Sequence, residues 1–428
     1  MGLAAVPKIF EDRMPLAMME PDHSAVLDLL SDRNIGKIKA KETVHFCGLA
    51  HVSPTQSVFF LPRNLRTQDK KRDLETAQLT MRTMARYGRD IRSRVGITPE
   101  EGDRSALIAV VESLADDYRR YGIYSERSRY RSRGSGKPDW KRSISRETPF
   151  FTDEGVAVYP DIRTSRSLDS RDNPLSRIQA AVLREISAAH GWWLEGMSGA
   201  KRDLLDFDLP LVPRALWKHR LRALLPTIYA ARAISLIKSM ISYLDETSDE
   251  TRGAFLSGVE DFERVWEEML RKTLDGVENI DWNARLPKPA YVDEHGIAQT
   301  IGSGMEMDIV VRRKGSEADH LHILDAKYYA ATGTGSVPKT GDIVKQLMYE
   351  LAMEAAIEDR GSGETVSGGF VFPSGGRYAR RFVEAGFKGG QTLDYRFPTI
   401  KIYYADIAQV MEAYAGRANF EMKLDAGD

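Results

Sequence analysis

The 428-residue chain lacks several features that would assign it to a class at once. Its single cysteine, Cys47, excludes a disulfide framework and a four-cysteine zinc site, and it fits a reducing cytosol. No apolar run approaches the length needed to cross a bilayer, and charged residues come too early at the start for a signal peptide. The formal net charge is only −1, so a surface for nucleic acid must be a local patch. We therefore expect a cytoplasmic protein that does not contact a membrane.

The signature motifs of two enzyme classes are also missing. The chain has no Gly-x-x-x-x-Gly-Lys-Ser/Thr loop, so it is not itself a P-loop motor. It has no Gly-x-Ser-x-Gly turn, which α/β-hydrolases use to present a nucleophilic serine. What it does have is 42% hydrophobic and 29% charged residues, the composition of a folded globular protein. Its length predicts two or three domains, because a single core stops growing before this size.

Apolar spacing divides the chain into three predicted segments. Residues 1–130 combine a predicted β-hairpin at 37–61 with amphipathic helices, and we expect an α+β domain that binds DNA or a partner. Residues 131–250 are predicted to be mainly helical, with one helix capped at Asn173. Residues 251–428 alternate helices and strands, which favours an α/β module with a mixed sheet.

The third segment carries its expected elements in a defined order. A helix is predicted at 254–274, and strands at 305–313 and 320–328 follow it, joined by a polar turn. A helix at 342–358 comes next, and two further strands and a closing helix from Asp406 complete the module. This order places chemically active side chains at the ends of two neighbouring strands.

A basic stretch interrupts the chain at 119–146, with ten Lys or Arg residues, two acids and interleaved aromatic residues. It could follow a phosphate backbone, bind a nucleotide-driven partner, or be a solvated flexible loop, and the composition leaves these alternatives open. The side chains that we expect to contact DNA are Arg127, Arg129, Arg131, Lys141 and Arg142, together with Tyr349 from the helix at 342–358.

The clearest chemical pattern lies at "LHILDAKYY", residues 321–329. Residues two apart on a strand share a face, so Asp325 and Lys327 point the same way where an apolar strand ends. The preceding strand begins with Asp308, and a hairpin would bring this residue beside Asp325. Two neighbouring carboxylates repel each other unless a cation lies between them, and their hard oxygen ligands suit Mg²⁺. Lys327 could then hold the scissile phosphate or a nucleophilic water.

The flanking helices offer further groups to this site. Glu263 and Glu267 lie on one edge of the preceding helix, and either could order a water or a second metal. Gln346 and Tyr349 lie about one turn apart on the following helix and are predicted to face the same site. An acid–x–Lys triplet alone is weak evidence, because the chain has three others, at 69–71, 139–141 and 421–423. Only the triplet at Asp325 follows another acid-bearing strand between two helices.

Several segments resemble a known family. "MDIVV", "ILDAKYY" and "DIVKQLMYE" are similar to the PD-(D/E)xK nuclease core, most of all in McrC-like subunits and LlaJI-type restriction endonucleases. "FERVWEEML", "GKPDWKRSI" and "SVFFLPRNL" resemble other segments of that group. One departure is Met307, which stands where the motif has proline. The resemblance implies a restriction-endonuclease-like mixed-sheet core at the C-terminal end, after an α+β and a helical region.

The resemblance also implies functions for residues and a partner. Asp308 and Asp325 would bind Mg²⁺, with Mn²⁺ as a substitute, Lys327 would be catalytic, and Glu263 or Glu267 would assist. The substrate would be double-stranded DNA, and the partner a McrB-like AAA+ NTPase motor. We therefore predict a Mg²⁺-dependent DNA endonuclease, the cleaving subunit of a restriction or phage-defence system. Two alternatives are an adaptor on a nuclease-like scaffold without cleavage, and a stand-alone repair or transposition nuclease.

Overall fold

The structure is a computed structural model. It describes residues 6–19, 23–32, 43–53, 56–67, 69–93, 104–133, 137–195, 197, 204, 207–247, 254–300, 302, 304–316, 318–331, 333–358, 363–377 and 380–424. None of the helices in these ranges is long and apolar enough to cross a membrane.

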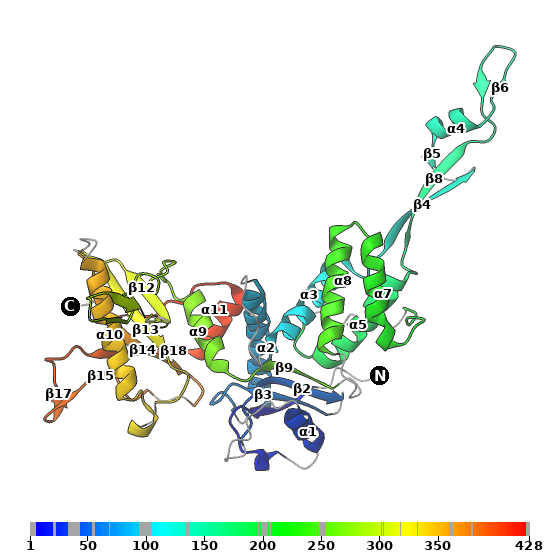
Figure 1. Cartoon of the computed structure of the whole chain (residues 1–428). Helices are drawn as coiled ribbons and strands as arrows, with labels where there is room; N and C mark the ends of the chain where they lie inside the picture. Colours follow the sequence, from blue (N-terminus) through cyan, green and yellow to red (C-terminus); the bar gives the residue numbers. More distant parts are fainter. Residues whose placement is uncertain are drawn as a thin grey trace. The chain divides into compact units, whose positions relative to one another are not determined.

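The chain forms two compact units (Figure 1). The larger unit joins Val6–Ala109 to Thr251–Asp428, and the smaller unit is built from Val110–Glu250. This division differs from the three segments predicted from the sequence, because a strand at the start of the third segment pairs with a strand of the first.

That strand is β9 (Phe255–Val259), which completes a four-stranded sheet in the order β1-β3-β2-β9. The other members are β1 (Lys8–Glu11), β2 (Cys47–Ser53) and β3 (Gln56–Leu61). β2 and β3 confirm the predicted hairpin over the described residues. The prediction of one helix over 254–274 is wrong at its start, since only α9 (Phe262–Thr273) is helical.

Two glycines allow β9 and β2 to approach closely. Gly48 has φ +142° and pairs with Gly258, where an added Cβ would lie 2.2 Å from the carbonyl oxygen of Cys47. Any side chain at either position would therefore push the strands apart. Two helices pack near this sheet, α1 (Ser24–Asp32) and α2 (Lys70–Ser93).

A second, mixed sheet in the larger unit has the strand order β12-β13-β14-β18-β15. Its members are β12 (Ile309–Arg313), β13 (His320–Ala326), β14 (Thr365–Ser374), β18 (Ile400–Asp406) and β15 (Glu384–Ala385). β13, β14 and β18 run parallel, whereas β12 and β15 are antiparallel edge strands. The expected mixed sheet is confirmed, with the first two strands shorter than predicted.

Helices cover both faces of this sheet (Figure 1). α10 (Thr340–Glu358) packs on one face, where Ile343 and Leu347 lie against Phe370 and Phe372. α9 and α11 (Ile407–Gly416) lie beside each other on the other side. α11 begins directly after Asp406, where the closing helix was predicted to start, and the Asp406 side chain caps it by accepting a hydrogen bond from the Gln409 backbone N–H. Small hairpins, β10–β11 (Ala290–Val292, Ala298–Thr300) and β16–β17 (Lys388–Gly389, Thr392–Leu393), extend from this part of the chain.

The smaller unit contains α5 (Pro174–His190), the helix predicted after Asn173, together with α7 (Trp217–Leu224), α8 (Ala231–Glu246) and most of α3 (Ser105–Tyr121). Asn173 caps α5 as predicted. Within the basic stretch 119–146, the alternative of a flexible loop is wrong for β4 (Glu126–Arg133), which pairs along its whole length with β8 (Arg163–Ser170).

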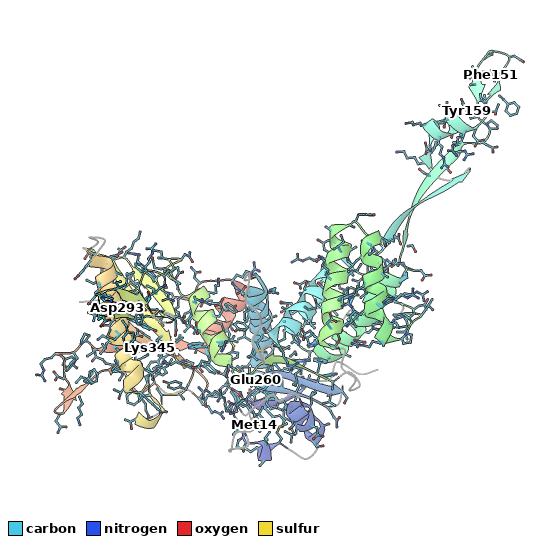
Figure 2. The ribbon with its side chains drawn as sticks, in the orientation of Figure 1. Met14, Phe151, Tyr159, Glu260, Asp293 and Lys345 are labelled. Atoms are coloured by element: carbon cyan, nitrogen blue, oxygen red, sulfur yellow. The ribbon has the colours of Figure 1, made fainter. Side chains whose placement is uncertain are left out.

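The β4–β8 ribbon carries further short elements: β5 (Lys137–Pro138), α4 (Trp140–Arg146), β6 (Phe150–Phe151) and β7 (Ala157–Val158). Figure 2 shows Phe151 and Tyr159 near the end of this projection from the smaller unit. Phe150 and Phe151 are both strongly exposed there.

Candidate active site

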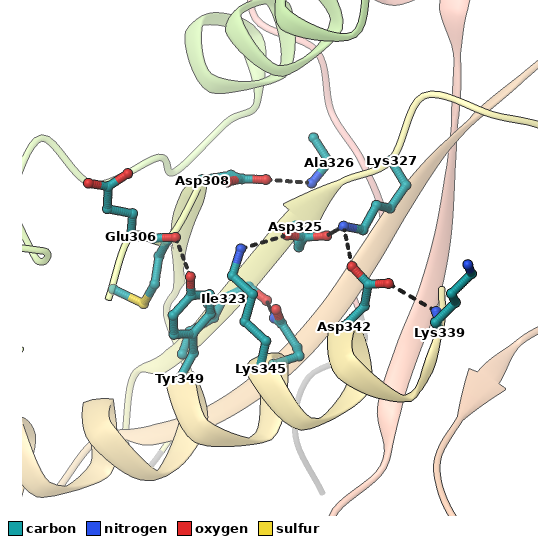
Figure 3. Close-up of polar contacts among 12 residues, drawn as sticks. Glu306, Asp308, Ile323, Asp325, Ala326, Lys327, Lys339, Asp342, Lys345 and Tyr349 are labelled. Atoms are coloured by element: carbon teal, nitrogen blue, oxygen red, sulfur yellow. Dashed lines mark hydrogen bonds and ion pairs between the residues drawn. The ribbon is translucent and has the colours of Figure 1, made fainter. Parts of the chain in front are cut away.

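The hairpin of β12 and β13 brings the two predicted aspartates together. Ile309 pairs with Leu324, so the next position of the same antiparallel register places Asp308 opposite Asp325. Directly opposed residues of an antiparallel pair point to the same face of the sheet. The predicted neighbourhood of these two acids is therefore confirmed, and Figure 3 shows both carboxylates above the N-terminal half of α10.

Asp308 lies just before β12 and reaches the end of the neighbouring strand. Its Oδ2 accepts a hydrogen bond from the backbone N–H of Ala326 at 3.0 Å. Burial, with the negative charges of Asp325 and Glu267, raises the pKa of Asp308 to about 7. Burial is the larger cause of this raised pKa, and the neighbouring negative charges add to it, so a cation between the acids would relieve the repulsion.

Lys327 is held between two carboxylates. Its Nζ lies 2.7 Å from Asp325 Oδ2 and donates a hydrogen bond to Asp342 Oδ1 at 3.0 Å. Although burial opposes its charge, the two acids raise the pKa of Lys327 above its usual value. Asp342 lies in the first turn of α10, and its other oxygen accepts the backbone N–H of Lys339 at 2.9 Å. Lys327 is therefore a fully charged ammonium in a fixed position.

The structure distinguishes the two glutamates of α9. Burial raises the pKa of Glu267, and the charges of Glu268 and Asp325 add to the effect. The charge of Glu267 in turn raises the pKa of Asp308, so Glu267 interacts electrostatically with both aspartates. Glu263 lies one turn earlier and is exposed. Of the two predicted candidates, Glu267 is the carboxylate close to the aspartate pair.

Gln346 and Tyr349 lie on the predicted face of α10, but both are buried. The Gln346 side chain is 1% exposed and its Nε2 donates to the Ile323 carbonyl at 2.5 Å, which fixes α10 on β13. Tyr349 is 3% exposed and its hydroxyl donates to the Glu306 carbonyl. Tyr349 also lines an open pocket beside Asp308, and its contact with DNA stays a prediction.

Two residues that the sequence analysis did not select complete the site. Asp342 and Lys345 lie on the same side of α10 as Gln346 and Tyr349, and Lys345 Nζ is 3.9 Å from Asp325 Oδ1. Helix positions three and four apart share a face, so the spacing from Gln346 and Tyr349 was a usable signal.

Asn283 fixes the backbone immediately before Asp308. Its Oδ1 accepts the backbone N–H of Met307 at 2.9 Å, and its Nδ2 donates to the Met307 carbonyl at 3.3 Å. The Asn283 side chain thus makes both backbone hydrogen bonds of Met307, as a neighbouring strand would do. Met307 stands where the motif has proline. Met307 is 7% exposed and packs in the core beside Trp282 and Val310.

The predicted DNA-binding residues of the basic stretch belong to the smaller unit. Arg127, Arg129 and Arg131 lie on β4, and their side chains are outside the described residues. Lys141 and Arg142 lie on α4, whose N-terminus is capped by the Asp139 side chain. Lys141 is exposed and Arg142 is half-buried. Their contact with DNA stays a prediction.

Comparison with known families decides the class of the protein. The model of the LlaJI restriction endonuclease family matches residues 46–400, which includes both aspartates and Lys327. The chain belongs to the LlaJI restriction endonuclease family. The expected resemblance to LlaJI-type restriction endonucleases is confirmed.

One individual relative shares a low sequence identity with this chain. The chain is 24% identical over 314 residues to the type II restriction enzyme BsuMI component YdjA of Bacillus subtilis (strain 168), covering 70% of this chain. The match spans 64% of that relative's length.

Two solved assemblies are also similar in structure. A half-complex of Thermococcus gammatolerans McrB AAA+ hexamers with bound McrC matches 96% of this chain and 98% of that chain, with 15% identity and a TM-score of 0.46. The McrBC complex of the same organism matches 62% of this chain and 85% of that chain, with 15% identity and a TM-score of 0.31.

The aspartate pair fits a magnesium ion better than a metal that needs a protein cage. Within the described ranges, no three Asp, Glu, His or Cys side chains form a group that could hold a metal. Mg²⁺ does not require such a group, because it keeps several waters and binds through one or two carboxylates and substrate phosphates. Asp308 and Asp325 are the residues that would hold it.

Asp308→Asn is expected to stabilise the metal-free protein at pH 8 by about 2 kcal/mol, and to change its stability little at pH 4. The folded state keeps a proton on Asp308 up to a pKa of about 7, whereas the unfolded state releases it near 3.8. Wild-type stability therefore falls as the pH rises between these values, and asparagine removes this loss. Urea unfolding at both pH values measures the difference. Glu306→Gln, an exposed acid two residues upstream, is the control. A variant less stable than wild type at pH 8 would contradict the argument.

Proposed function

We propose that this protein is a Mg²⁺-dependent DNA endonuclease and the cleaving subunit of a restriction or phage-defence system. The observation that carries the proposal is the group at the ends of β12 and β13, where Asp308, Asp325 and Lys327 lie together. The family match supports a nuclease of a restriction system. We also propose that the mixed sheet with α9 and α10 is a PD-(D/E)xK core, with Met307 in place of the motif's proline.

Each residue of the site would have a separate role in phosphodiester hydrolysis. Bound Mg²⁺ would neutralise phosphate charge and make a water molecule more acidic. Asp308 and Asp325 would hold the ion, and Glu267 would accept a hydrogen bond from the attacking water on the α9 side. Lys327, charged and fixed by Asp342, would stabilise the negative charge that develops on the phosphate oxygens.

The partner is part of the proposal. YdjA is named as a component of a restriction enzyme, and the McrC chain of the solved assembly is bound to McrB AAA+ hexamers. Since the chain has no P-loop of its own, we propose that a separate AAA+ NTPase supplies DNA translocation.

Plasmid cleavage tests this function. The purified full chain, alone and mixed with its AAA+ partner and nucleotide, is incubated with modified and unmodified supercoiled DNA. We expect nicked or linear product with Mg²⁺ or Mn²⁺, and none with EDTA. Folded protein that never cuts with the partner and either metal would refute cleavage and leave the adaptor alternative. Cleavage that never depends on a motor would favour a stand-alone nuclease.

A further inference from the structure

A second lysine lies at the aspartate pair and differs from Lys327 in exposure. Lys345 projects from α10 toward Asp325, with Nζ 3.9 Å from Oδ1 (Figure 3). This distance is too long for a hydrogen bond, so the ammonium is attracted to the carboxylate without being fixed to it. Its side chain is 48% exposed, compared with 16% for Lys327.

The two lysines therefore differ in how many of their N–H donors are available to a ligand. The Lys327 ammonium has two carboxylates within 3.0 Å, one on either side. An ammonium has three N–H donors, so most of the capacity of Lys327 is already used by the protein. Lys345 Nζ lies 5.2 Å from the centre of the Tyr349 ring, which supports the charge from one side.

An open pocket lies on the same side as Lys345. It has a volume of about 430 Å³, and its lining includes Asp308, Glu306 and Lys345. Lys327 is not part of this lining. The pocket reaches one of the two proposed metal ligands, and among the described residues that line it Lys345 is the only lysine or arginine. An anionic group that approached Asp308 through this pocket would meet Lys345.

We propose that Lys345 is a second catalytic cation of this site, which binds a phosphate oxygen of the DNA strand beside Asp308. The inference rests on the proposed nuclease function and assigns a ligand class, a nucleic-acid phosphodiester, to the pocket. Lys327, which two carboxylates hold in place, stabilises the negative charge that develops on the phosphate. Lys345 lies at the open pocket and binds the backbone of the DNA strand next to the carboxylates.

The experiment separates DNA binding from cleavage. Binding of the full chain to a short DNA duplex is measured against salt concentration with Ca²⁺ in place of Mg²⁺, and single-turnover cleavage is measured with Mg²⁺ and the partner. We expect Lys345→Ala to reduce the slope of log K against log salt by about 0.9, the effect of one lost phosphate contact. We expect cleavage to slow by about 10- to 100-fold. Lys345→Arg, which keeps the charge, should stay within about fivefold of wild type.

Lys339→Ala is the matched control. Lys339 precedes α10 by one residue, and its ammonium points away from the aspartates (Figure 3). Its bond to Asp342 uses the backbone N–H, which alanine retains. This variant should keep the salt slope and the cleavage rate of wild type.

The outcomes separate this inference from the function on which it rests. If wild type cleaves and Lys345→Ala keeps both the salt slope and the rate, the assignment of Lys345 is wrong while the nuclease stands. If wild type never cleaves, the proposed function fails, and an unchanged salt slope in Lys345→Ala would then refute the phosphate contact as well. A slope reduced equally by Lys339→Ala would also overturn the assignment, because it would show only a general effect of charge.

Discussion

Lys327→Met is expected to lower the rate of DNA cleavage by about 10³-fold while DNA binding changes little. Methionine keeps most of the length and volume of the lysine stem, so the change removes mainly the charge. In the folded protein this charge lies 2.7 Å from Asp325 and is oriented by Asp342. A cation fixed in advance costs no reorganisation when negative charge develops on the phosphate, which is why its loss should appear in the rate constant. Single-turnover cleavage with saturating Mg²⁺ and partner measures it.

Stability must be separated from catalysis in this variant. Asp325 is 5% exposed, and when Lys327 is removed the remaining cation beside it among the described residues is the more distant Lys345. We expect Lys327→Met to cost about 2 kcal/mol in unfolding free energy, less than a fully unpaired buried charge. Adding Asp325→Asn removes that charge, so the double variant should regain stability and stay inactive. Lys339→Met is expected to behave as wild type in both assays. Cleavage by Lys327→Met within about tenfold of wild type would exclude the proposed role of Lys327.

The part of the site that could be predicted depends on local patterns. Two apolar strands each begin or end with an acid, and a short polar turn joins them. This arrangement leaves little freedom for the register in which the two strands pair. The pairing of Ile309 with Leu324 follows from this, and with it the meeting of Asp308 and Asp325. The face of α10 could be predicted for the same reason, because helical spacing places Gln346 and Tyr349 together.

How deeply each side chain is buried could not be predicted from these local patterns. The packing of α10 on the sheet buries Gln346 and Tyr349, while Asp342 lies beside Lys327 and Lys345 lies beside Asp325. This packing includes residues of other strands, such as Phe370 and Phe372 of β14 in one apolar cluster with Leu347.

The segment 254–274 shows how tertiary pairing can override a helical pattern. Phe255, Val259 and Phe262 have helical spacing, yet the first two lie on β9. Their strand is stabilised by pairing with β2, some 200 residues earlier in the chain, through the close contact of Gly48 and Gly258. Apolar spacing within a short window carries no information about such a partner.

Glu267→Gln is expected to lower DNA cleavage by about 10- to 100-fold and to weaken the apparent affinity for Mg²⁺ by a similar factor. Glu267 shares the electrostatic environment of Asp308 and Asp325, and its charge contributes to the raised pKa of Asp308. Glutamine has nearly the same shape but carries no negative charge, so it is not a base at neutral pH and attracts a cation much less than glutamate does. Mg²⁺ titrations of the single-turnover rate measure both effects.

The same change one helical turn away provides the matched control for α9. Glu263→Gln alters an exposed carboxylate on the same edge of the helix, so both variants lose one negative charge from α9. We expect Glu263→Gln to cleave at the wild-type rate, because α9 places this side chain outside the group that raises the pKa of Asp308. If the two variants lose activity equally, the carboxylates act through their general field and Glu267 has no specific role. If only Glu263→Gln loses activity, DNA binding must rotate or shift α9 so that the exposed edge of the helix faces the aspartates.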